Sequence, residues 1–152
     1  DGMRQGNGTL SIQFGHGDGG EYMLTVYNGQ WEDDLRSGSG SYTVKTYAKP
    51  SGGGSSIKSS TSGLGRFTAL EERVVFMYEG EWSDDAVNGT GIARHVADDW
   101  NFNGQLKNGR FHGTGTYKSS KGTVREYVGE WVNNRMHGKG TLTYSNGCVF
   151  NG

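Results

Sequence analysis

The sequence contains one cysteine and one proline in 152 residues, and it is poor in aliphatic side chains. Because a disulfide needs two cysteines, none can form within the chain, and a reducing compartment is the simplest interpretation. Cys148 is expected to be a small buried apolar residue. Leu, Ile, Val and Phe together number only 26 residues, a low content that is often associated with disorder.

Long apolar runs are also missing. No segment approaches the roughly 20 apolar residues of a membrane-spanning helix, and the first residues show no signal-peptide pattern. We therefore expect a soluble, cytoplasmic protein, with the cytoskeleton, a cilium or a membrane as sites of association. Disorder is nevertheless not expected, because the net charge is only -1 and aromatic residues reach 12%.

The chain is rich in glycine, and most of its 28 glycines recur at fixed intervals. Four segments carry an aromatic residue followed two positions later by a glycine, and a Gly-x-Gly pattern begins nine residues after that glycine. They begin at Tyr27, Tyr78, Phe102 and Tyr127. Such self-similarity is typical of repeat proteins, in which each unit packs on its neighbours.

Each unit is expected to form a β-hairpin. Residues 27–31 read Tyr-Asn-Gly-Gln-Trp, and a strand places the two rings and the glycine of this stretch on one face. Turn-forming residues follow, such as Asp33 and Asp34, and the return strand carries the Gly-x-Gly pattern. Since glycine is unfavourable inside a strand, we expect an aromatic ring to lie across the glycines of the neighbouring strand.

The repeats define one array over residues 1–152. Residues 47–77 are either a degenerate copy or an inserted loop, and Gly63–Thr68 favours the degenerate copy because it has the return-strand pattern in register with the other copies. Since the chain begins and ends inside the pattern, we expect a segment of a longer array. The array comprises a partial copy at 1–14, copies at about 27–46, 78–97, 102–120 and 127–145, and the start of a further copy at 148–152.

The pattern Tyr-x-Gly-x-Trp, a turn and Gly-x-Gly-Thr resembles the MORN repeat, the membrane occupation and recognition nexus motif, over most of the chain. The resemblance implies an all-β, solenoid-like fold without significant helix: an elongated, twisted, single-layer antiparallel sheet of consecutive hairpins with an aromatic-lined groove. The sequence departs from the pattern at Leu106, where tryptophan is usual, and at residues 47–77, so we expect the groove to be interrupted there. Members of the family include junctional membrane proteins, ciliary and cytoskeletal scaffolds, lipid kinases and lysine methyltransferases.

No residue pattern indicates an enzyme, a cofactor or a metal site. Residues 15–20 satisfy G-x-G-x-x-G, but a strand-like segment follows them where a dinucleotide site needs a helix. The histidines match no catalytic or zinc-binding spacing, and the paired aspartates at turns are best explained as solvated carboxylates. We therefore predict a non-catalytic module, and a catalytic domain elsewhere in a longer parent chain stays open.

Our first hypothesis for function is that an aromatic groove holds a segment of a partner protein, such as the apolar face of a helix. The alternative is that the rings only stabilise the sheet. Because a single-layer sheet cannot bury both faces, we expect some rings to remain exposed. The candidate groove residues are Tyr27, Trp31, Tyr78, Trp82, Phe102, Tyr127 and Trp131.

The second hypothesis is binding to acidic phospholipid headgroups. Residues 102–152 carry a net charge of +5 and residues 1–101 carry -6, so the positive charge lies in the C-terminal part. Nucleic acid is not expected, because its binding proteins are more basic. Open sheet edges would also permit a homodimer or end-to-end association. The candidate headgroup-binding residues are Lys107, Arg110, Lys118, Lys121, Arg125, Arg135 and Lys139.

Overall fold

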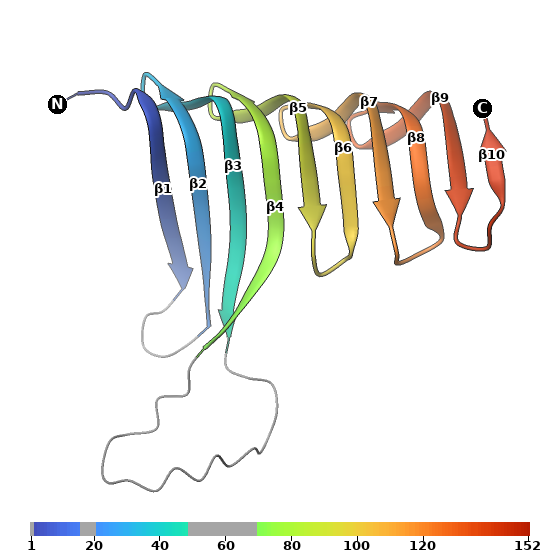
Figure 1. Cartoon of the computed structure of the whole chain (residues 1–152), viewed down its shortest axis with the longest axis horizontal. Helices are drawn as coiled ribbons and strands as arrows, with labels where there is room; N and C mark the ends of the chain where they lie inside the picture. The colour runs from blue at the N-terminus through green and yellow to red at the C-terminus, as the bar shows by residue number, and fades with distance from the viewer. Residues whose placement is uncertain (1, 16–20, 49–69) are drawn as a thin grey trace, which may run out of the picture.

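The computed structural model describes residues 2–15, 21–48 and 70–152, and this part of the chain consists of β-strands, turns and connecting segments (Figure 1). Since these residues form no helix, none that could cross a membrane is found among them. The strands are β1 (Gly6–Gly15), β2 (Tyr22–Glu32), β3 (Leu35–Ala48), β4 (Glu71–Ser83), β5 (Ala86–His95), β6 (Trp100–Lys107), β7 (Arg110–Ser119), β8 (Val124–Val132), β9 (Arg135–Tyr144) and β10 (Val149–Asn151).

The ten strands form one open antiparallel sheet in which every strand pairs with its neighbours in the chain. They stand side by side along the long axis of the molecule, with the N-terminus at one end and the C-terminus at the other (Figure 1). This meander of hairpins confirms the predicted all-β, single-sheet architecture. A sheet of this kind has no second layer, so its core must be built on its own faces.

The turn within each of the four copies contains two residues with positive φ. In the first of them, Asp33 and Asp34 have φ angles of 49° and 69°. A type I′ turn needs positive φ at both central residues, and Asp, Asn and Gly are the residues that adopt it most readily. The other three turns are Asp84–Asp85, Asn108–Gly109 and Asn133–Asn134. The paired polar residues of each copy therefore form the hairpin turns, as the sequence indicated.

Each return strand contains a bulge at its Gly-x-Gly pattern. In β3, Gly38 and Ser39 have no partner on β2. Gln30 of β2 fills this gap, because its Oε1 accepts the backbone N–H of Ser39 at 2.8 Å. Gly38 has a φ of 59°, and a Cβ added there would overlap the Gln30 side chain. The equivalent pairs are Glu81 with Thr90, Gln105 with Thr114 and Glu130 with Lys139.

The first ring of each copy lies on the glycine of the neighbouring strand. A Cβ added to Gly40 would come within 2.6 Å of the Tyr27 ring, so only glycine permits this contact. The prediction that rings cover the Gly-x-Gly pattern is therefore confirmed. The same arrangement joins Tyr78 to Gly91, Phe102 to Gly115 and Tyr127 to Gly140.

The long interval between the first two clear copies does not interrupt the sheet. β3 pairs directly with β4, with Gly40 opposite Gly80 and Tyr42 opposite Tyr78. The two strands are the longest of the sheet, with 14 and 13 residues. The predicted return strand at 63–68 lies outside the described residues. Because β3 and β4 are hydrogen-bonded neighbours, the regular hairpin order continues across this connection.

Candidate interaction face

We call the side of the sheet that carries the first ring of each copy the aromatic face. The seven rings predicted to line a groove all lie on it, and the exposed fraction of each is between 0% and 6%. They therefore form the core of the sheet, and the expectation that some of these seven remain exposed is wrong. The rings are Tyr27, Trp31, Tyr78, Trp82, Phe102, Tyr127 and Trp131, and they are joined in the core by Ala93 and Leu106.

The hydroxyl groups of the core tyrosines bind backbone carbonyls. Tyr78 Oη donates to the carbonyl of Glu81 at 3.0 Å. Burial raises the pKa of Tyr78 to about 12, so the hydroxyl stays protonated and can donate at any physiological pH. Tyr27 and Tyr127 make the same bond within their own copies. The core is therefore apolar, and the hydrogen bonds of its tyrosine hydroxyls are satisfied.

The tryptophans connect each copy to the one before it. Trp82 Nε1 donates to the carbonyl of Gly40 at 3.3 Å, and its ring lies edge-on to Tyr27 at 5.1 Å between centroids. These contacts cross from β4 to the preceding hairpin. Trp31 and Trp131 reach back in the same way, to the carbonyls of Gly8 and Gly115.

A side chain of the preceding hairpin covers each tryptophan. The covering residue stands two positions before the Gly-x-Gly pattern, and at Trp82 it is Arg36, whose guanidinium carbon lies 4.6 Å from the ring centroid. Such stacking combines apolar contact with cation–π attraction. Sequence analysis missed this position, although the recurrence of Arg4 and Arg36 at equal distances from a glycine marks it. The equivalent pairs are Arg4 on Trp31 and Phe111 on Trp131.

The hairpin turns also bind to one another. Asp85 N donates to the carbonyl of Arg36 at 3.1 Å, and Asp85 Oδ1 accepts the N–H and the Nε–H of Arg36 at 2.8 and 3.0 Å. The backbone N–H of Arg36 holds the pKa of Asp85 below its ordinary value, although desolvation opposes this. Arg4 lowers the pKa of Asp34 in the same way, first through its backbone N–H. Turn residues are thus a second line of contact between copies.

The accessible surface of the aromatic face comes from a second row of apolar residues. Two hollows lie on it, one of about 420 Å³ between β3 and β7 and one of about 360 Å³ over β1 to β3. They adjoin at Arg36 and Tyr42, which line both, and we call the two hollows together the groove. The sequence did not single out these residues, because alternation identifies a face but not the depth of each side chain on it. Four of the seven predicted rings also line the hollows: Tyr27, Trp31, Tyr78 and Trp82. The second row consists of Leu10, Ile12, Phe14, Tyr42, Phe76, Val87, Trp100 and Phe111.

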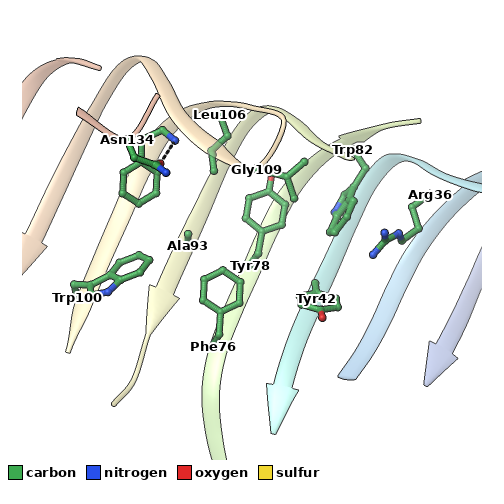
Figure 2. Close-up of a pocket in the computed structure, with 12 residues that line it drawn as sticks. Arg36, Tyr42, Phe76, Tyr78, Trp82, Ala93, Trp100, Leu106, Gly109 and Asn134 are labelled. Atoms are coloured by element: carbon green, nitrogen blue, oxygen red, sulfur yellow. Dashed lines mark hydrogen bonds between the residues drawn. The ribbon is translucent and has the colours of Figure 1, made fainter. Parts of the chain in front are cut away.

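The expected interruption of the groove at Leu106 is not found. Leu106 lies in the larger hollow, and Figure 2 shows it on the side near the turns, while Trp100, Phe76 and Tyr42 lie along the other side. The shorter side chain therefore deepens the groove. The groove reaches Phe111 on β7.

The seven predicted headgroup-binding residues are exposed but do not form one surface. Lys107 and Arg110 line a hollow of about 350 Å³ beside a hairpin turn, together with His112, whose Nδ1 is buried without a hydrogen-bond partner. Lys118 pairs with Glu126 at the other end of its strand. Lys121 and Arg125 lie with Lys118 at that end, Arg135 lies at a hairpin turn, and Lys139 lies within β9.

The remaining candidate positions are the possible metal ligands, the glycine-rich loop and Cys148. Among the described residues, no group of three His, Cys, Asp or Glu side chains is close enough to hold a metal ion. Residues 16–20 of the glycine-rich loop lie outside the described part, and the segment after it is the strand β2. Cys148 is exposed, so the expectation that it is buried is wrong. It follows Asn146 and Gly147 in the connection between β9 and β10, whose residues are all exposed.

Comparison with known proteins agrees with this geometry. The family model of the MORN repeat matches residues 27–44, 78–93, 102–124 and 127–149, which together are more than half of the chain. No curated protein matches the chain by sequence. MORN repeats are commonly non-catalytic modules that mediate protein or membrane interactions. The four matched segments coincide with the four hairpins whose rings, bulges and turns are described above, and the chain belongs to the MORN repeat family.

Proposed function

We propose that this chain is a non-catalytic interaction module of the cytoplasm that holds an apolar segment of a partner protein in its groove. The groove is the single observation that carries the proposal. It runs from β1 to β7, is lined mainly by apolar side chains and has no second layer of the described chain above it. Contiguous apolar surface of this kind typically marks a protein interaction site.

The exposure of individual side chains supports this choice of face. Ile12 and Phe14, at one end of the groove, have exposed fractions of 43% and 50%. On the opposite face, Ile92 is similarly exposed, but Glu79 and Asn103 flank it on the neighbouring strands. The apolar residues are therefore contiguous on the aromatic face and separated by polar ones at this point of the other face. An apolar helix or strand of a partner gains most by binding the aromatic face.

The proposal can be tested with a displayed library of random peptides selected on the purified chain. We expect the enriched peptides to be rich in apolar residues and to lose about tenfold or more in affinity on the double variant Phe14→Lys and Tyr42→Lys. The matched control is Val128→Lys, which places the same charge on the opposite face. Failure to enrich peptides, or equal binding to the double variant, would contradict the proposal.

A second candidate function is binding to acidic headgroups at the hollow that contains Lys107 and Arg110. The two cations and the unpartnered Nδ1 of His112 support it. We expect sedimentation with phosphatidylserine-containing vesicles at low salt, release by salt, and no sedimentation with phosphatidylcholine alone. Lys107→Glu with Arg110→Glu should abolish the sedimentation, whereas Arg125→Glu, at the other end of the strands, should leave it. Equal sedimentation with both kinds of vesicle would reject this candidate.

A further inference from the structure

We call the contact between one copy and the next a junction. Three positions contribute to it: the tryptophan, the residue that covers it and the second turn residue. One junction differs from the others at all three positions. At the junction of Trp82, the covering residue is Arg36 and the second turn residue is Asp85. At the next junction, the covering residue is Val87, and Leu106 stands where the other copies have tryptophan. The second turn residue is Gly109. All three side chains are smaller than their counterparts, so this junction lacks much of the side-chain volume that fills the other one.

The missing volume is visible as the larger hollow of the groove. The hollow has a volume of about 420 Å³, and its lining includes Val87, Leu106 and Gly109. Figure 2 labels Leu106 and Gly109 among the lining residues. Leu106 also lacks the indole N–H that, in three other copies, donates to the second glycine of the preceding copy. The backbone of this copy is otherwise regular, because Gly91 still pairs with Gly104. The hollow therefore lies at the place where three other copies carry a tryptophan and this copy carries Leu106.

The walls of this hollow are aromatic. Trp100 lies edge-on to Phe111, with 5.7 Å between ring centroids, and makes a similar contact with Phe76 at 6.4 Å. Tyr42 and Trp82 close the side toward β3. Aromatic rings in such surroundings gain from edge-to-face and offset contacts in addition to apolar burial.

We propose that this hollow is an anchor pocket for one large aromatic side chain of a partner protein, with tryptophan as the best fit. The inference rests on the proposed function of the groove and names the residue that the groove selects. The partner ring takes the place above Leu106 that the indole and its covering arginine fill at the Trp82 junction. Interfaces commonly concentrate their affinity in such buried aromatic anchors.

The charge at the edge of the pocket is already paired. Of the twelve residues that line the anchor pocket, Arg36 is the only charged one. Its Nε lies 3.0 Å from Asp85 Oδ1, and its guanidinium stacks on Trp82. The pocket therefore offers no free charge that would select an acidic or a basic neighbour of the anchor. The expected ligand is thus defined by its aromatic ring, with tryptophan as the best fit.

The first test measures ring binding without a peptide. N-acetyltryptophanamide is titrated into the chain, and the methyl signals of Ala93, Val87 and Leu106 are followed by NMR. We expect saturable shifts of these methyl groups and no shift of Val128 on the opposite face. Leu106→Trp should fill the pocket and abolish the shifts of Ala93 and Val87. Absence of binding to the original chain would overturn the anchor pocket.

The second test uses the peptides selected from the displayed library. We expect an enriched tryptophan whose replacement by alanine lowers affinity about tenfold or more, and the same loss on Leu106→Trp. Val87→Arg, which restores the covering residue, is the second variant if Leu106→Trp fails to give a folded NMR spectrum. Val128→Trp is the matched control.

These outcomes separate the two proposals. Peptides that lose affinity on Phe14→Lys with Tyr42→Lys, but bind Leu106→Trp and Val87→Arg as tightly as the original chain, leave the groove function intact and overturn the anchor pocket. Binding of N-acetyltryptophanamide without any enriched peptide supports the ring site and contradicts the groove function. Enriched peptides without an aromatic residue also overturn the anchor pocket.

Discussion

Trp82 and Leu106 occupy the same position in successive copies, on β4 and β6, and their surroundings differ sharply. Arg36 stacks on Trp82 and binds Asp85, whereas Leu106 has only Val87 and Gly109 at these positions. Both junctions nevertheless keep the glycine pairing and the turn-to-turn hydrogen bond of the backbone. The backbone ladder is therefore sufficient to continue the sheet, and the side chains decide whether a junction is filled or hollow.

The largest effect is expected from Trp82→Leu, which makes the first junction resemble the second. The change removes a buried indole, its N–H bond to Gly40 and its stacking on Arg36. We expect the free energy of unfolding to fall by about 3 kcal/mol, measured by urea denaturation. Trp82→Phe should lose less, because it keeps a ring. A loss below about 1 kcal/mol for Trp82→Leu would show that the indole adds little to the backbone ladder.

A smaller effect is expected from acid, which should weaken the junction of Asp85 before the junction of Gly109. The pKa of Asp85 lies below its ordinary value of 3.8, mainly because the carboxylate accepts the N–H of Arg36. A lowered pKa means that the carboxylate stabilises the fold above pH 3.8 and that this contribution disappears as the pH falls through the lowered pKa.

Asp85→Asn should accordingly lower stability at neutral pH by under about 1 kcal/mol, since the side chain is nearly half exposed. The difference in urea midpoint between Asp85→Asn and the original chain should shrink as the pH falls to about 3. Asp84→Asn is the control, because that carboxylate accepts a bond from Ser83 in the same turn. A difference that grows in acid would contradict this account of the junction.

The smallest effect is expected from Gly109→Asn, which restores the turn residue of the neighbouring junctions. A Cβ at Gly109 meets nothing within 4 Å, and its φ of 72° is close to the 65° of Asn134. Asn134 Oδ1 accepts the N–H of Phe111, so an asparagine at position 109 should accept the N–H of Val87. We expect a gain of about 0.5 kcal/mol in thermal or urea denaturation. A loss would mean that glycine is required at this turn.

The fold could be predicted because its determinants are local. Alternation within residues 27–31 assigns the two rings and the glycine to one face, and the turn residues Asp33 and Asp34 suit the positive φ of a two-residue turn. The packing of rings on Gly-x-Gly also followed, since a flat aromatic ring can cover the backbone that a strand glycine leaves open. The role of Gln30 was missed, because the bulge that it fills is a property of two paired strands.

The candidate site was harder to predict. The seven rings chosen from the motif are among the most buried residues of the face. Four of them line the hollows, but the groove is also lined by residues outside the motif, such as Tyr42 and Trp100. Sequence analysis singled out Leu106 as a departure but expected an interruption there. In the structure, this position is a hollow of the groove, because the covering residue Val87 and the turn residue Gly109 beside Leu106 are also small.

The sequence by itself determined the repeat, the hairpins, the open single sheet and the family, because each of these depends on spacings within about two dozen residues. Only the tertiary structure decided which rings are core and which remain accessible. Burial on a single-layer sheet depends on the side chain that the preceding hairpin places over each ring, as Arg36 does for Trp82. That partner stands many residues away in the chain, and only the pairing of strands brings it there.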